Sequence, residues 1–224
     1  MGDYHDDPRK GIEDGYIFFL PENESLKKNH FYLPKFVNEE LLYPEQDDQF
    51  LTVFIDHYTC QQRKEKDLAK ESINEVFRQI STSEVELKIY YPTSKGIEIN
   101  PVKPEIPLND EREIYKYVNF DEIAKIYRKT HIFFPTHRET QGMVAQEIGA
   151  CGGITLMQKW MYPEKVHYQF PHLLYNTGTK IDFKKIKQYM LLREIRDKFR
   201  LHVMANCGFK NFSNKLIDTI LSLC

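Results

Sequence analysis

Short apolar runs alternate with amphipathic stretches from residue 50 to the end of the chain. The first run, 50–55, is almost continuously apolar and contains β-branched residues, which is typical of a strand buried on both faces. Further strands are predicted at 85–91, 131–134, 154–157 and 172–176, and helices at 65–80, 121–129, 183–205 and 213–223. Because strands alternate with helices, we predict parallel βαβ units. The expected fold is α/β, a single Rossmann-like domain with a mostly parallel sheet flanked by helices.

Single residues predict where some strands and helices begin or end, and the alternation of strands with helices predicts where the domain begins. Pro92 is expected to end the second strand, and the proline-rich stretch that follows it, 93–108, is expected to be a long loop. Ser213 is the expected N-cap of the last helix. Residues 1–48 lack the alternating pattern. We therefore predict an N-terminal extension or interdomain connector over 1–48 and the Rossmann-like domain over 49–224.

Composition and charge exclude several classes of protein. The 224 residues suffice for one hydrophobic core, and a net charge of −2 does not favour nucleic-acid binding. No apolar run approaches the roughly 18 residues of a transmembrane helix, and the acidic N-terminus lacks the apolar core of a signal peptide. The four cysteines are scattered, with no spacing typical of zinc or of a disulfide framework. We expect reduced thiols, no metal site and a cytoplasmic protein.

The most informative segment is 131–153, where a predicted strand enters a polar loop that opens a helix rich in small residues. A helix N-terminus offers unpaired N–H groups and a partial positive charge, so this segment predicts an anion site, with phosphate as the first candidate. Glu139 and Glu147 bracket the transition from loop to helix, and Gly142 would let a ligand approach the backbone.

The position of Glu147 on this helix favours a ligand contact. Val144, Ile148 and Cys151 form one helical stripe that should pack on the sheet, and Glu147 projects about 60° from it at ~100° per residue. A carboxylate at the edge of a buried face needs a hydrogen-bond partner, and ligand hydroxyls are suitable. The spacing of the two glutamates also permits a solvated Glu139 and a Glu147 paired with a structural arginine.

The segment 135–155 resembles the donor-binding domain of GT-B glycosyltransferases, in particular the retaining class with a Glu-x7-Glu motif. The strand, the proline, the two glutamates, the loop glycine and the following strand occur in the order of that motif. Three further segments, 33–38, 117–127 and 211–214, are similar to other parts of the same domain. Thr140 stands where the family has a glycine and Gln141 where it has an aromatic residue, so the sugar specificity cannot be carried over.

The resemblance implies a role for each matching position. Glu139 would bind hydroxyls of the donor sugar and Glu147 the ribose, while Arg63 and Lys66 would stabilise the leaving diphosphate as the cations after the first strand. The arginine and lysine could equally belong to an exposed helix face. The remaining implied contacts to the donor, partly through the backbone, are His57, Val118, Asn119, Gln141, Gly142, Met143 and Val144.

The implied reaction transfers a sugar from a UDP- or GDP-sugar donor to a glycan, protein or lipid acceptor, with retention expected and no cofactor or metal required. A GT-B enzyme has two Rossmann-like domains, and this chain has room for one. It is therefore expected to be part of a larger enzyme, one subunit of a split enzyme that needs an acceptor-binding partner, or a non-catalytic nucleotide-sugar-binding module. An α/β interaction protein with structural glutamates is the alternative from a different class.

Overall fold

The computed structural model describes residues 16–18, 30–32, 36–45, 49–56, 66–93, 96–101, 120–136, 143–161 and 170–223. Their main element is a six-stranded sheet in the order β5-β4-β3-β6-β7-β8. All neighbouring strands run parallel except β5, which pairs antiparallel with β4. The predicted fold, a Rossmann-like α/β domain with a mostly parallel sheet, is confirmed. The strands are β3 (Leu51–Ile55), β4 (Leu87–Thr93), β5 (Gly96–Ile99), β6 (Ile132–Phe134), β7 (Ile154–Gln158) and β8 (His172–Tyr175).

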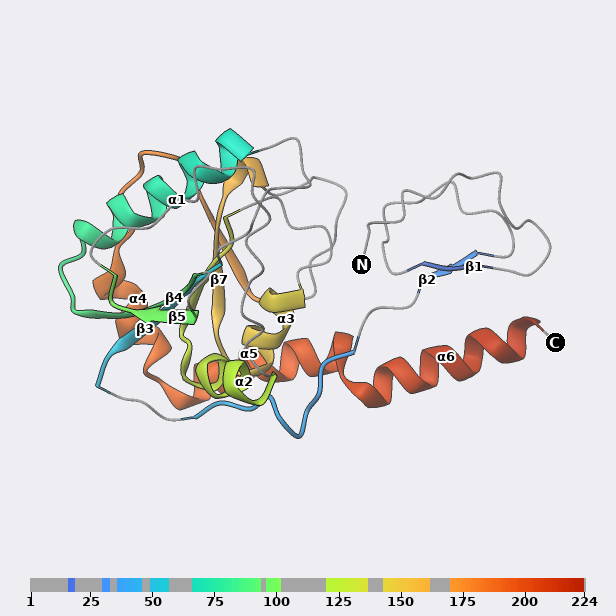
Figure 1. Cartoon of the computed structure of the whole chain (residues 1–224). Helices are drawn as coiled ribbons and strands as arrows, with labels where there is room; N and C mark the ends of the chain where they lie inside the picture. The colour runs from blue at the N-terminus through green and yellow to red at the C-terminus, as the bar shows by residue number, and fades with distance from the viewer. Residues whose placement is uncertain are drawn as a thin grey trace.

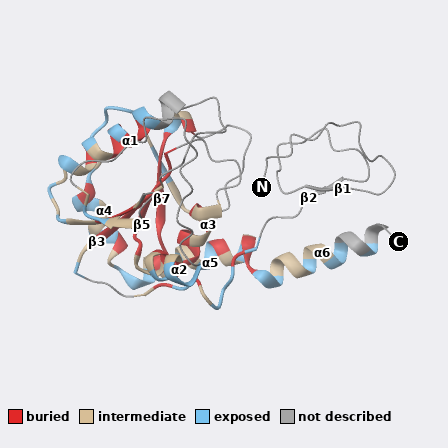
Figure 2. Ribbon diagram, in the orientation of Figure 1, coloured by how far each residue is buried: buried red, intermediate tan, exposed pale blue. Residues whose placement is uncertain are grey.

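Helices cover both faces of the sheet (Figure 1). The helices are α1 (Lys66–Ser81), α2 (Phe120–Lys129), α3 (Met143–Ala150), α4 (Phe183–Met190), α5 (Arg193–Cys207) and α6 (Phe209–Leu223), with a short 3-10 helix η2 (Lys159–Met161). Helices α1 and α4 contribute Val76, Phe183 and Met190 to the core on one face, and α2, α3 and α5 pack on the other. The strands between these layers are the most buried part of the molecule (Figure 2). Outside this sheet, β1 (Tyr16–Phe18) and β2 (His30–Tyr32) pair in parallel.

The segment before β3 joins the core. Val37 and Leu42 are buried, and the Val37 N–H donates to the Cys207 carbonyl at 2.9 Å. Val37 also forms a parallel bridge with Gly208, between α5 and α6. The segment that precedes the sheet therefore lies beside the junction of α5 and α6. Among the described residues, no helix is long and apolar enough to cross a membrane.

Two predicted boundaries are wrong because edge pairing continues past them. Pro92 lies inside β4, opposite Ile97 of the antiparallel strand β5, and does not end the strand. The pairing of β4 with β3 stops at Tyr90, so no bond to β3 is lost where proline lacks its N–H. Part of the expected loop at 93–108 is therefore strand β5.

The expected helix 183–205 is two helices, α4 and α5. Leu192 between them has extended backbone angles (φ −79°, ψ 115°), which turn the chain from the α4 face of the sheet towards α3 on the other. Helix α6 begins at Phe209, so Ser213 lies inside it and is not its N-cap. No glycine or proline lies at the break between α4 and α5. The break occurs because the two helices pack on opposite faces of the sheet.

Candidate functional site at the carboxyl edge of the sheet

The order in which strands are added to the sheet reverses between β3 and β6. After β3 it adds β4 on one side, and it then returns to place β6 on the other side of β3, with Val53 opposite Ile132. In open α/β sheets, ligands bind beyond the carboxyl ends of the strands at such a switch point, because the two loops diverge and leave a crevice. The segments that leave β3 and β6 at this point lead to α1 and α3. The N-termini of both helices therefore lie at the carboxyl edge.

Four of the predicted site residues, Lys66, Met143, Val144 and Glu147, belong to the described part of the chain. Met143, Val144 and Glu147 lie on α3, with Met143 and Val144 half-buried, and the α1 backbone begins at Lys66. The others, which lie outside the described residues, are His57, Arg63, Val118, Asn119, Glu139, Gln141 and Gly142. Two of the segments concerned, 57–65 and 137–142, connect β3 to α1 and β6 to α3, so the topology brings their strand-end anchors together. The individual roles stay predictions.

Glu147 is a half-buried carboxylate, as its helical position predicts. Among the described residues, nothing makes a hydrogen bond or ion pair with its side chain. Burial raises the pKa of this carboxyl to about 7. Arg196 and Arg200, on the helix α5 that packs on α3, donate to backbone carbonyls at the end of α3 instead. A structural arginine partner for Glu147 is therefore absent from the described part of the chain.

The raised pKa of Glu147 predicts that this side chain destabilises the unliganded protein above neutral pH. The unfolded carboxyl ionises near pH 4.5 and the folded one near 7, so stability is lost as pH rises across this window. We expect Glu147→Gln to raise the free energy of unfolding at pH 8 by about 2 kcal/mol, a value reduced for partial exposure. Urea unfolding at pH 5 and pH 8 would test this, and an equal effect at both pH values would contradict it.

Thr136 is a second unpartnered polar group at this edge, and sequence analysis did not single it out. Its side chain is fully buried just after β6, and its hydroxyl has no hydrogen-bond partner among the described residues. A buried hydroxyl without a partner is costly, so such a group is uncommon in a native fold unless something else satisfies it. The only sequence signal was its place directly after Pro135 in the motif.

The small residues of the motif serve packing at the opposite end of α3. A Cβ on Gly152, whose φ is +79°, would come within 2.7 Å of the Arg196 Cβ on α5. A Cβ on Gly149 would come within 2.8 Å of a Val203 methyl group. The run of small residues after Glu147 therefore allows α5 to approach α3, and it is not evidence for a ligand.

Two arginines of α5 fix this end of α3. Arg196 is buried and donates to the carbonyls of Cys151 and Arg128, each at 2.9 Å, and of Glu45 at 2.7 Å. Arg200 donates to the carbonyl of Ala150 at 2.8 Å. The carbonyls of Arg128, Ala150 and Cys151 lie at the C-terminal ends of α2 and α3, where a positive charge is favourable. The arginines thus orient α3, and through it Glu147, from the edge remote from the crevice.

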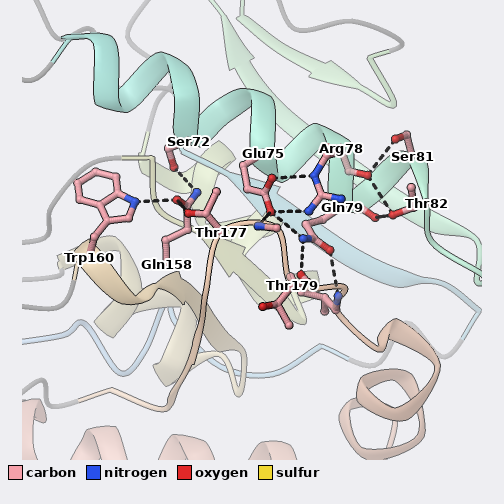
Figure 3. Close-up of polar contacts among 12 residues, drawn as sticks. Ser72, Glu75, Arg78, Gln79, Ser81, Thr82, Gln158, Trp160, Thr177 and Thr179 are labelled. Atoms are coloured by element: carbon pink, nitrogen blue, oxygen red, sulfur yellow. Dashed lines mark hydrogen bonds and ion pairs between the residues drawn. The ribbon is translucent and has the colours of Figure 1, made fainter.

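A polar network ties α1 to the other strands of the sheet (Figure 3). The amide of Gln158, at the end of β7, donates to the Ser72 hydroxyl at 2.9 Å, and its oxygen accepts from Trp160 at 2.7 Å. Nearer the end of α1, Glu75 accepts two bonds from Arg78 at 2.7 Å and one from Gln79 at 2.8 Å. The Arg78 hydrogen bond is the largest cause that lowers the pKa of Glu75 to about 2. Since these groups satisfy one another, the network positions α1 and offers no free ligand.

The fold has counterparts among solved structures. The chain has the fold of one half of a GT-B glycosyltransferase structure. It is similar to sucrose-phosphate synthase from Thermosynechococcus elongatus, with a TM-score of 0.58 and 12% identity, over 92% of this chain and 57% of that one. It is also similar to TarM, with a TM-score of 0.50 and 15% identity, over 86% of this chain and 39% of that one.

These comparisons show the fold, and at this identity they do not transfer a substrate. The chain spans about half the length of the structures it matches, 57% and 39%. No protein-family model and no curated protein sequence matches it.

Proposed function

We propose that this chain is the donor-binding half of a glycosyltransferase and binds a nucleotide-diphosphate sugar at the switch point between β3 and β6. The observation that carries the proposal is Glu147, a half-buried carboxylate with a pKa raised to about 7 and no partner among the described residues. Such a group is unfavourable in the empty protein and becomes satisfied when a ligand supplies hydroxyl donors. A ribose diol fits this requirement.

The rest of the proposed site follows from charge. The N-termini of α1 and α3 at the same edge carry partial positive charge, which suits a diphosphate. Arg63 and Lys66, before and at the start of α1, are proposed to add cationic charge, and Glu139 is proposed to bind the sugar. When the bond between the anomeric carbon and the phosphate oxygen breaks, its electron pair passes to the diphosphate. The helix N-termini and cations would stabilise the charge that develops there.

A binding panel tests the donor site. UDP, GDP and their sugars at millimolar concentration should raise the melting temperature, because a ligand that binds only the folded state adds about 2.7 kcal/mol at a hundredfold excess over its Kd. Glu147→Ala should remove the shift. Lys70→Ala, an exposed position on α1, should keep it. The proposal fails if no nucleotide shifts the transition, or if both variants behave alike.

The alternative is a non-catalytic subunit that binds the nucleotide sugar without turnover. The comparisons show the fold alone, which is compatible with binding without turnover. A nucleotide-sugar hydrolysis assay separates the two. Nucleotide binding without hydrolysis or transfer under any condition, including the presence of a partner chain, would select the binding subunit.

A further inference from the structure

Trp160 is the single tryptophan of the chain, and it lies just beyond the carboxyl end of β7. It belongs to the short helix η2 and is partly exposed. Its indole N–H donates to the side-chain oxygen of Gln158 at 2.7 Å. Because the N–H is the only polar group of an indole, the surface that this side chain can still offer to a ligand is the apolar face of its rings.

Buried hydrogen bonds hold Gln158, and with it the indole, in one orientation. Gln158 is 3% exposed, and its amide donates to the Ser72 hydroxyl of α1 at 2.9 Å. Its oxygen also accepts from the Thr177 hydroxyl, just after β8, at 3.1 Å. Since α1, β7 and the segment after β8 all contribute to this network, the position of the Trp160 ring is set by the sheet and its helix before any ligand binds.

The ring lies at the edge of the sheet where the donor is proposed to bind. In Figure 3 it is on the Ser72 side of the network, towards the start of α1. Ser72 lies about 9 Å from the N-terminus of α1, at ~1.5 Å per residue. Trp160 also packs against the core cluster to which α3 contributes Ala145 and Ile148. The indole is therefore linked to both helices whose N-termini are proposed to bind the diphosphate.

We propose that the face of the Trp160 indole stacks on the ring of the donor sugar. This inference rests on the proposed function. The C–H groups on one face of a pyranose form an apolar surface, which gains from contact with an aromatic ring. Along a donor, the diphosphate separates the ribose from the sugar. With the ribose at Glu147 and the diphosphate at the helix N-termini, a ring near the start of α1 meets the sugar and not the base.

Intrinsic fluorescence reports on this contact directly, because all tryptophan emission of the chain comes from Trp160. The purified chain is titrated with UDP-glucose, UDP-N-acetylglucosamine and GDP-mannose, and with UDP and GDP as references that lack the sugar. We expect at least one nucleotide sugar to change the emission at saturation more than its own nucleoside diphosphate does. Equal changes within every pair would overturn the stacking role. A melting shift without that difference leaves the donor site standing, whereas no binding at all refutes both proposals.

Calorimetric titration of variants then separates the sugar from the nucleotide. Trp160→Ala should raise the Kd of that nucleotide sugar roughly fivefold and keep the Kd of its nucleoside diphosphate within about twofold, because only the sugar loses an aromatic contact. Trp160→Phe, which keeps an aromatic face, should recover most of the loss. Tyr189→Ala, which removes an exposed ring from α4, should change neither Kd.

A Trp160→Ala variant that weakens both ligands equally would show that the tryptophan only supports the fold, and would overturn the proposal. If this variant does not fold, the fluorescence titration of the unaltered chain still decides between the outcomes.

Discussion

Replacing Arg196 with alanine should lower the free energy of unfolding by about 3–5 kcal/mol, because hydrogen bonds to a charged donor contribute roughly 1.5–3 kcal/mol each and a cavity adds to their loss. The guanidinium is 3% exposed and joins the carbonyls of Glu45, Arg128 and Cys151. Without it, three carbonyls at the ends of α2, α3 and the entering segment lose a charged donor, and a cavity replaces the side chain. Because this arginine orients α3, nucleotide affinity should fall as well.

Urea denaturation followed by circular dichroism measures this effect at pH 7. Lys198→Ala, two residues further along the same helix and exposed, is the matched control and should stay within about 0.5 kcal/mol of the parent. A loss below about 1 kcal/mol for Arg196→Ala would show that water replaces the guanidinium and that α3 does not depend on it.

His131 should make the protein sensitive to acid by about 3 kcal/mol between pH 7 and pH 4. Its side chain is buried beside β3, where Nδ1 accepts from the Thr52 N–H at 3.1 Å. Burial is the main cause that lowers the pKa of this imidazole to about 3, and the positive charge of Arg196 adds to it. The unfolded histidine protonates near pH 6.5 and the folded one near 3, so stability is lost as pH falls across this window.

The variant His131→Asn isolates this contribution, because the asparagine oxygen can accept the same backbone bond and does not titrate. The free energy of unfolding should fall less steeply between pH 6.5 and pH 4 in the variant than in the parent. Glu75, with its pKa lowered to about 2, also weakens the fold in acid, but equally in both proteins. Parallel pH profiles for the two proteins would contradict this prediction, because they would show that the pKa of His131 is the same in the folded and unfolded states.

The pattern of apolar residues predicted the positions of the central strands correctly. The buried runs at β3, β6 and β7 are apolar because each strand is covered on both faces, so their position follows from composition alone. The break at Leu192 and the strand β5 were missed because neighbouring elements, and not local propensity, decide them.

The candidate site was partly predictable. The position of Glu147 at the edge of the buried face followed from helical geometry, and its half-buried state agrees. The packing role of the small residues next to it could not be predicted, because a glycine required by the approach of α5 looks the same in sequence as one required by a ligand. The contacts of Arg196 were not predictable, since carbonyl acceptors are present at every residue and leave no sequence signal.

The sequence by itself determined the α/β class, the strand–loop–helix segment at 131–150 and the place of Glu147 on its helix, because all three depend on residues close together in the chain. Only the tertiary structure decided that β6 lies beside β3, which brings the carboxyl ends of the two strands together at one edge of the sheet. It also decided that, among the described residues, none is a partner of Glu147 and none buries the exposed side chains Phe209, Ile217 and Leu221 of α6. These features depend on the pairing of segments far apart in sequence, and such pairing is set by the packing of the whole fold.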